Sequence, residues 1–423
     1  PVTGPEKPNT RKSFARIFVQ SFSFGFFFDT GGPYALIWKQ QRPDCPSGCR
    51  RRGAAASSRP PRTRSDLLKR ILVINTGSTS TKIAVFEDQT KCMEQNIVHP
   101  VEALRQCADL NAQLPLRQQA ILAALQAAGQ DPAGFDAIAA RGGTFGMVQG
   151  GAYLVDEALL AACRAPVTSH ASNLSAILAA VFAETSGCDA YIYDAVCVNE
   201  VEDIARMTGL KEVKRRPFSH VLNTRATARD VAASLGRRYE DMVFIVAHLG
   251  GGISINLHRS GRIIDLCSDD EGPMSPERAG KLNGKSYVDL CYSGRYTKPE
   301  MMRHIKGEGG LVSHLGTSSL IEVEQRIAEG DTYARAVLEA MAYQIAKEIG
   351  ALATVVSGQV DSIILTGGCA YSRMLTDLIR DRVAFLAPVT VVPGAKEMEA
   401  LAEGVLRVLG GKEPVHRYQS AKE

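Results

Sequence analysis

The chain has 423 residues, of which 45% are hydrophobic, enough apolar material for two domains with cores of their own. Residues 1–70 carry 14 Lys and Arg against 4 Asp and Glu, whereas the remainder carries 35 against 41. Because the larger part is acidic, a nucleic-acid-binding role for the whole chain is excluded. No apolar run reaches the ~18 residues of a membrane helix.

The first seventy residues differ from the rest in composition. They hold the single Trp and seven of the fourteen Phe, and the stretch at 50–64 is rich in Arg, Ala, Ser and Pro. We expect residues 1–69 to be a disordered or non-native extension, with translation starting near 67–69 and residues 1–66 an over-extended reading frame. A secretory signal or an organelle-targeting arm is the alternative.

Ten cysteines are scattered along the chain without metal-ligand spacing. This usage favours free thiols in a reducing cytoplasm over disulfides.

A strand, a polar turn and a second strand open the larger part of the chain. Apolar β-branched runs at 71–75 and 82–87 flank a turn rich in hydroxyl groups, which predicts a hairpin. A glycine permits the tight turn, and backbone N–H groups there can cradle phosphate oxygens. The alternative is an ordinary polar turn. The candidate phosphate-binding residues are Asn75, Gly77, Ser78, Thr79, Ser80 and Lys82.

Two later stretches repeat the strand followed by a glycine turn. Residues 245–257 predict strand, turn and strand, and residues 362–370 predict a strand that ends in glycines before a helix at 371–382. Together, the three turns resemble the two phosphate loops and the adenosine loop of the acetate and sugar kinase, hsp70 and actin superfamily. The nucleotide-binding residues indicated are His248, Gly250, Gly251, Gly252, Ser254, Gly367 and Gly368.

Charged side chains mark the ends of other predicted elements. Arg141 follows a strand predicted at 135–140 and precedes two glycines, where it could meet a ligand or serve as a surface arginine in a plain turn. Asp194 ends a strand predicted at 190–193, where α/β sheets bind ligands, or it caps a helix. Glu397 opens a helix, where the helix dipole alone would favour a carboxylate.

Two histidines and one arginine lie in predicted loops. His170 precedes a helix for which Ser169 or Ser172 would be the cap, and His220 precedes another helix. Either histidine could face a cleft or have a structural role. Arg278 lies in a long loop with Gly, Pro and several charges, which is typical of a functional loop.

The strand–turn–strand plan occurs at 71–87 and again at 243–257, each time followed by further α/β units. Two similar halves predict two related domains, at 70–240 and 241–423, with a cleft between them. We expect the cleft to hold the active site, because its closure can exclude water. A long amphipathic helix predicted at 331–356 would pack in the second core.

From about residue 70 to residue 407 the sequence resembles the butyrate kinases of the acetate kinase family. Two details depart: Thr76 stands where Pro is commoner, and Ser219 separates Phe218 from His220. The resemblance implies an α/β fold of two duplicated ribonuclease H-like (actin-like ATPase) domains with an interdomain active-site cleft. It rests on segments 75–82, 169–174, 248–254, 271–278 and 397–402.

The resemblance also implies an activity, ATP-dependent phosphorylation of butyrate to butyryl phosphate with release of ADP. Arg141 would hold the substrate carboxylate and Arg278 the transferring phosphoryl group. His220 would donate a hydrogen bond to that group, and His170 would line the site. We expect a cytoplasmic homodimer or higher homo-oligomer that binds neither nucleic acid nor membranes. Mg²⁺ would be organised by Asn75, Asp194 and Glu397.

Other functions remain open from the sequence. A kinase of the same fold could act on acetate, propionate, a branched short-chain acid or a sugar, and for a sugar hydroxyl Asp194 could serve as base. A non-catalytic, nucleotide-switched chaperone or scaffold would lack both active-site arginines. A panel of acceptors offered with ATP distinguishes these functions.

Overall fold

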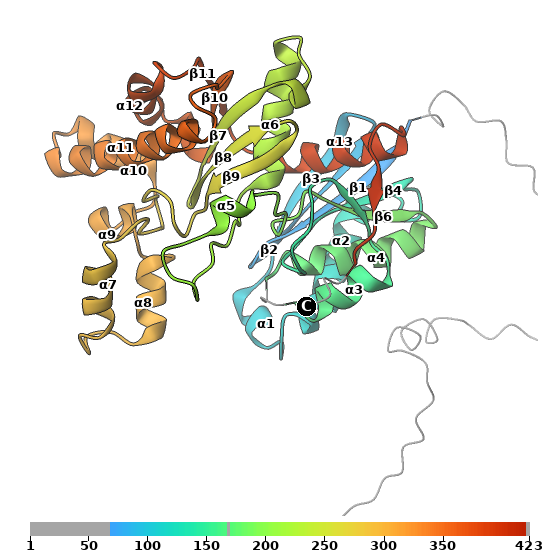
Figure 1. Ribbon diagram of the computed structural model, residues 1–423. Helices are drawn as coiled ribbons and strands as arrows, with labels where there is room; N and C mark the ends of the chain where they lie inside the picture. Colours follow the sequence, from blue (N-terminus) through green and yellow to red (C-terminus); the bar gives the residue numbers. More distant parts are fainter. Residues whose placement is uncertain (1–67, 167–169, 420–423) are drawn as a thin grey trace, which may run out of the picture. The chain divides into compact units, whose positions relative to one another are not determined.

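The computed structural model describes residues 68–166 and 170–419 (Figure 1). The predicted extension at its residues 1–67, and the predicted cap Ser169, lie outside the described residues. Within the described part of the chain, no helix is long and apolar enough to cross a membrane.

The first sheet of the described chain has seven strands in the order β12-β5-β6-β4-β1-β2-β3. Strand β1 pairs antiparallel with β2 and parallel with β4, and β4 pairs parallel with β6. The predicted hairpin is therefore confirmed, and parallel strands flank it. The bounds are β1 Arg70–Thr76, β2 Ser80–Glu87, β3 Thr90–Val98, β4 Ala137–Arg141, β5 Ala152–Leu154, β6 Asp189–Tyr193 and β12 Val415–His416.

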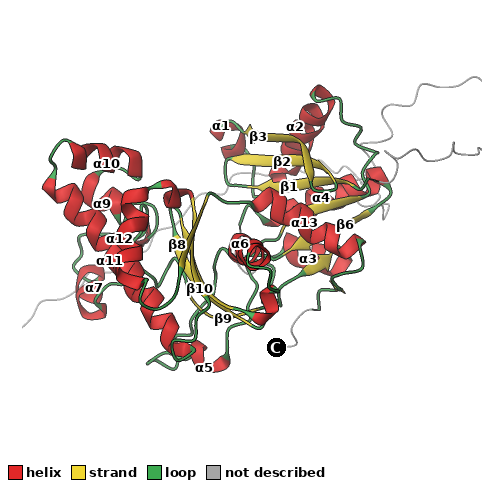
Figure 2. Ribbon diagram, turned by 90° about the horizontal axis from the view of Figure 1, so that it is seen from above, coloured by secondary structure: helices red, strands yellow, loops and turns green. Residues whose placement is uncertain are grey.

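Apolar side chains leave β1 on both faces, which explains its continuous hydrophobic run. Leu72 and Ile74 pack against helices α2 (Leu114–Ala127) and α4 (Asn173–Ser186). Ile71 and Val73 pack on the other face with apolar residues of α13 (Glu397–Leu409). Figure 2 shows the sheet between these helical layers.

The second sheet has five strands among the described residues, in the order β11-β10-β7-β8-β9. Helix α6 (Val221–Ser234) covers one face, and helices α11 (Thr332–Val355) and α12 (Arg373–Val383) cover the other. The predicted long helix at 331–356 is confirmed as part of this core. The bounds are β7 Val243–Leu249, β8 Ile253–Arg259, β9 Arg262–Cys267, β10 Ser362–Gly367 and β11 Val389–Pro393.

Two helices pack on the sheet that is formed mainly by the other half of the sequence. Helix α13 lies on the first sheet, and β12 joins it, although both come late in the chain. Helix α6 lies on the second sheet, although it precedes β7. The division at 70–240 and 241–423 stays a prediction, but one cut at residue 240 does not separate the elements of the two sheets.

Shorter elements complete the described chain. Helix α4 begins after Ser172, but no side-chain cap bond comes from that serine, so its predicted capping role is wrong. The remaining helices are α1 Val101–Arg105, α3 Glu157–Arg164, α5 Asp203–Arg206, α7 Gly284–Cys291, α8 Lys298–Ile305, α9 Leu311–Leu315 and α10 Leu320–Ala328. Single 3₁₀ turns are η2 Asn111–Gln113, η3 Tyr239–Asp241 and η4 Gly368–Tyr371.

Candidate functional site

A buried arginine holds the β1–β2 turn from behind. Arg117 of α2 is fully buried and donates to the carbonyl oxygens of Ser78 (2.9 Å) and Ser80 (2.8 Å) and to the hydroxyl of Thr81 (3.0 Å). The Gly77 N–H closes the turn on the carbonyl of Ser80 at 2.8 Å. Because the arginine takes the carbonyl groups, the exposed side of the turn can present hydroxyl groups of Ser78 and Thr79 to an anion.

No sequence motif indicated Arg117, although it is the one charged residue of α2. By contrast, Lys82, the predicted phosphate cation, lies 3.4 Å from Glu94 of β3 and is 42% exposed. Pairing of β2 with β3 brings these two side chains together, which the sequence pattern did not indicate.

The β7–β8 turn packs against two carboxylates. A Cβ on Gly251 would lie 3.0 Å from a Glu277 oxygen, and one on Gly252 would lie 2.9 Å from Asp269 Oδ2. The Glu277 N–H also donates to the carbonyl of Gly251 at 3.0 Å. The two glycines therefore allow the Glu277 and Asp269 side chains to lie close to the turn, in addition to any contact with a nucleotide.

Two predicted site histidines stack on one another behind this turn. The rings of His220 and His248 are parallel, with centroids 3.9 Å apart. The Lys396 N–H donates to Asn223 Oδ1 at 3.1 Å, so the Asn223 amide nitrogen faces His248 Nδ1, 2.9 Å away. His248 Nδ1 must then accept, which places the ring proton on Nε2, beside Gly250.

Three cations affect the pKa of His220. Burial and the charges of Arg141, Arg278 and Lys306 lower its pKa to about 4, so the ring is neutral at pH 7. The pKa of His170 is lowered by burial, Arg141 and Lys306. The predicted catalytic residues Arg141, His170, His220 and Arg278 are thus brought into one electrostatic neighbourhood, together with Lys306.

Both predicted arginines retain unused donors. Buried Nε atoms of Arg141 and Arg278 have no hydrogen-bond partner among the described residues. Arg278 Nε lies 3.4 Å from Asp269 Oδ2, and Arg141 Nη1 lies 3.4 Å from Glu397. A buried guanidinium N–H group without a hydrogen bond is costly unless a ligand satisfies it, so both arginines can take anionic oxygens.

The two glycines after Arg141 pack the strand end instead of admitting a ligand. A Cβ on Gly143 would lie 1.6 Å from Asn173 Oδ1, and one on Gly142 would lie 2.3 Å from the Ala195 Cβ. Gly143 allows the end of β4 to lie against the start of α4, and Gly142 allows it to lie against the end of β6, which positions Arg141.

Asn75, at the end of β1, donates to Glu397 Oε2 at 2.8 Å. Two of the three predicted metal residues are therefore adjacent, and Arg141 lies against the same carboxylate. Oxygen donors of this kind suit Mg²⁺, which keeps several waters and substrate phosphates as ligands.

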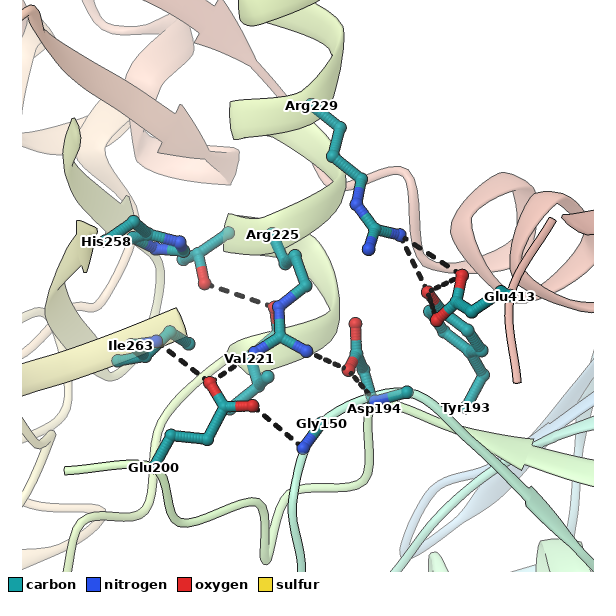
Figure 3. A network of polar contacts seen from close by, with 12 residues as sticks. Gly150, Tyr193, Asp194, Glu200, Val221, Arg225, Arg229, His258, Ile263 and Glu413 are labelled. Carbon is teal, nitrogen blue, oxygen red and sulfur yellow. Dashed lines mark hydrogen bonds and ion pairs between the residues drawn. The ribbon is translucent and has the colours of Figure 1, made fainter. Parts of the chain in front are cut away.

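The third predicted metal residue, Asp194, is engaged elsewhere. Its Oδ1 accepts from the Gly151 N–H at 2.9 Å and from Arg225 Nη1 at 2.6 Å, and Arg225 Nη2 donates to Glu200 at 2.6 Å (Figure 3). Burial raises the pKa of Asp194, against the opposing effect of Arg225. No hydrogen bond or ion pair of the described chain joins Asp194 to Asn75 or Glu397.

No group of three or more His, Cys, Asp or Glu side chains among the described residues could hold a metal ion unaided. A magnesium ion at Asn75 and Glu397 would therefore need water and phosphate oxygens to complete its coordination. That donor set fits Mg²⁺ delivered with a nucleotide.

The third glycine turn lies beside the second. Gly367 has φ +91°, and a Cβ there would lie 2.3 Å from the Leu249 carbonyl oxygen, whereas nothing lies within 4 Å of a Cβ on Gly368. The Thr366 hydroxyl faces the amide of Asn223 at 3.4 Å. Glycine is needed at 367 because of its positive φ and the close approach of β7. At Gly368, by contrast, a side chain would meet only open space.

A cavity of about 430 Å³ lies close in the chain to Arg141 and His220. Its walls are largely apolar and include Met147, Val198 and Phe218. Arg215 and Arg216 also line this cavity, so it offers an apolar wall with positive charge beside it.

Structural comparison identifies the fold. The chain matches Porphyromonas gingivalis acetate kinase with a TM-score of 0.64 and 19% identity, over 81% of this chain and 100% of that chain. It matches Entamoeba histolytica acetate kinase with a TM-score of 0.65 and 16% identity, over 79% and 98%. These matches define the class: the chain has the two-sheet α/β fold of acetate kinases, and the predicted fold class is confirmed.

Sequence comparison gives the family. Residues 182–387 match the model of the Acetokinase family. Over 353 residues the chain is 44% identical to butyrate kinase 2 of Clostridium acetobutylicum, covering 83% of this chain and 99% of that relative. The chain belongs to the acetokinase family, as the motifs predicted.

Proposed function

We propose that this protein transfers the γ-phosphoryl group of ATP to butyrate, forming butyryl phosphate and ADP. The observation that carries the proposal is the clustering of Arg141 and Arg278 around the neutral His220, with a buried Nε on each arginine that makes no hydrogen bond. The relative from C. acetobutylicum, similar over most of the chain, is a butyrate kinase and supports this acceptor.

The reaction needs charge neutralisation more than proton transfer. A carboxylate oxygen attacks the γ-phosphorus in line, the bond from phosphorus to the bridging oxygen breaks, and ADP leaves with the electron pair. Butyrate is already an anion, so no base is required. Two anions must approach, and the fork of a guanidinium group neutralises planar oxygens without losing its own charge.

Each residue then has a distinct task. Arg141, beside Glu397, would hold the acid, and Arg278 the transferring phosphoryl group. Ser254 Oγ lies 2.9 Å from His220 Nδ1; a hydrogen bond from this hydroxyl leaves the ring proton on Nε2, ready to be donated to a phosphoryl oxygen. Because the His220 pKa is low, the ring donates as a neutral group at pH 7.

The nucleotide would lie between the glycine turns. The turn at 77–80 and the turn at 250–252 would face the phosphates, and Gly367 and Gly368 the adenosine. Asn75 and Glu397 would hold Mg²⁺ through water or directly. Asp194, at the end of β6, would contribute only through bound water, because its Oδ1 accepts from Gly151 and Arg225. When bound, the ion neutralises phosphate charge and aligns the γ-phosphoryl group.

The apolar cavity beside Phe218 suits the propyl group of butyrate. One methylene changes binding by roughly 1–3 kcal/mol, so we expect loose chain-length preference, with propionate, valerate and isobutyrate as competitors.

We also propose a cytoplasmic homo-oligomer, with residues 331–356 contributing to its interface. Tyr333 and Tyr343 of α11 are about half exposed, which supports this surface. A dimer or larger species in light scattering is the expected result, and a monomer would contradict it.

The decisive experiment measures acyl phosphate as hydroxamate, with ATP and straight-chain acids of two to six carbons. We expect turnover to be greatest near butyrate and to collapse in Arg278→Ala. Product from sugars instead of acids, or a fully active Arg278→Ala variant, would contradict the proposal.

A further inference from the structure

We propose that Lys306 is a third cation of the phosphoryl site, with its ammonium group contacting the γ-phosphoryl oxygens. This inference rests on the proposed kinase function and adds a residue that no motif of the sequence indicated.

The backbone places Lys306 opposite Arg278. The two residues form an isolated antiparallel bridge. Flanking bonds hold it, from the Ala279 N–H to the Ile305 carbonyl at 3.1 Å and from the Gly307 N–H to the Glu277 carbonyl at 2.8 Å. Opposed residues of such a pair project their side chains to the same side, roughly 5 Å apart at Cβ. Lys306 therefore accompanies the arginine assigned to the phosphoryl group.

Close packing fixes this geometry. A Cβ on Gly310 would lie 1.7 Å from the Ser275 carbonyl oxygen, and one on Gly309 would lie 2.3 Å from the Ala279 nitrogen. The segment after Lys306 thus lies directly on the loop of Arg278. On the other side, Lys306 ends helix α8, whose first turn has a complete capping box of Thr297 and Glu300.

The ammonium group is near the glycine turn but weakly paired. Lys306 Nζ lies 3.9 Å from Asp269 Oδ2 and 3.7 Å from Asp270 Oδ1, both beyond hydrogen-bond distance. The same Asp269 oxygen lies 3.4 Å from Arg278 Nε and directly beneath Gly252. Arg278 Nη1 also lies 3.8 Å from Glu277 Oε2, so three carboxylates surround the two cations, and none approaches closer than 3.4 Å. These long contacts leave N–H groups of both cations available for shorter hydrogen bonds to an anion.

Its influence reaches both histidines of the site. The charge of Lys306 contributes to lowering the pKa of His170, before α4, and of His220, before α6. These histidines come from separate parts of the fold, and the charge of Lys306 acts on both. Its side chain is 51% exposed, which leaves the ammonium accessible to a ligand.

Chemistry explains why a lysine would serve beside two arginines. An ammonium is a compact, mobile point charge that can follow an oxygen as the phosphoryl group moves, whereas a guanidinium fork fixes planar geometry. Lys306 would then act on the terminal phosphate of ATP, which ADP lacks.

The test compares Lys306→Ala with Lys306→Arg and with Lys285→Ala, an exposed lysine on α7. We expect kcat for butyryl hydroxamate formation to fall about 10²-fold in Lys306→Ala, with partial recovery in Lys306→Arg. Lys285→Ala should match the wild type. Melting temperatures of all variants check that the fold is retained.

Calorimetry separates this inference from the proposed function. Lys306→Ala should weaken ATP binding while leaving ADP binding unchanged, a distinction that a merely structural residue would not make and that needs no acceptor. Equal ATP affinity and equal kcat in Lys306→Ala and wild type would overturn the inference. If Lys306→Ala weakens ATP binding but not ADP binding, and the wild type does not phosphorylate acids, only the proposed function is overturned.

Discussion

The β1–β2 turn and the β7–β8 turn share one plan but lie beside side chains of opposite charge. The first turn lies over Arg117, which takes its carbonyl groups from a fully buried position. The second lies over the carboxylates of Asp269 and Glu277, which approach its glycine Cα atoms. The repeated hairpin is therefore a common scaffold, whereas the support behind each turn is particular to it.

This difference indicates a division of labour. A cation behind the first turn holds it rigid and adds positive potential where phosphates would lie. The carboxylates behind the second turn instead orient the loop of Arg278, which supplies the positive charge for the reaction. We infer that the first turn is a fixed cradle and that the second positions the reacting groups.

Removing the charge supplied beside the second turn should have the largest effect. Arg278→Ala should lower kcat by about 10³-fold or more, because an arginine at the transferring phosphoryl group is worth that much in related chemistry. Hydroxamate formation at saturating ATP and butyrate measures it. Arg303→Ala, on exposed α8, is the matched control and should retain turnover; a comparable loss in both would deny Arg278 its role.

Removing the support of the first turn should act on stability. Arg117→Met keeps the bulk but leaves two carbonyl groups without their donor, so we expect a loss of about 3 kcal/mol in the free energy of unfolding. Urea denaturation measures the change. Gln119→Met, at an exposed position on the same helix, should change it by less than ~0.5 kcal/mol. A stable Arg117→Met protein would mean that the turn does not depend on its buried arginine.

The histidine beside the second turn predicts an acid sensitivity. The pKa of His220 is about 4 in the folded protein and near 6.5 when unfolded, so the unfolded state binds more protons between these values. Stability should therefore fall as pH drops from 6.5 to 4. The full shift corresponds to about 3 kcal/mol, and a half-buried ring should contribute about 1–2 kcal/mol.

Denaturant unfolding at pH 7 and pH 4.5 tests this expectation in wild type and His220→Gln. The variant should lose less stability between the two pH values than the wild type does. An identical loss in both proteins would assign the acid sensitivity to other groups, such as His248 and His258, whose pKa values are also lowered by burial.

The smallest effect is expected at Lys82, near the first turn. Because its ammonium pairs with Glu94 at an exposed site, Lys82→Met should change the KM for ATP by less than about threefold. Steady-state kinetics with ATP varied gives the value. A tenfold increase would show that the lysine leaves Glu94 when the nucleotide binds.

Local sequence patterns predicted much of this molecule. Continuous apolar runs ending in glycine indicated β1, β7 and β10, and the ends of those strands indicated where a ligand would bind. The roles of Arg117 and Lys306 could not be predicted from local patterns, because they depend on contacts between segments far apart in the sequence. The partner of Lys82 depends on the register between β2 and β3, and Asp194 turned out to bind Arg225, contacts that no local pattern encodes.

Hydrogen–deuterium exchange with MgADP tests most directly whether the β1–β2 turn and the β7–β8 turn bind the same nucleotide. The account predicts that the backbone amides at 76–81 and at 248–254 are protected together, while amides of the exposed α7–α8 region are not. Protection of only one turn, or of neither, would contradict the account.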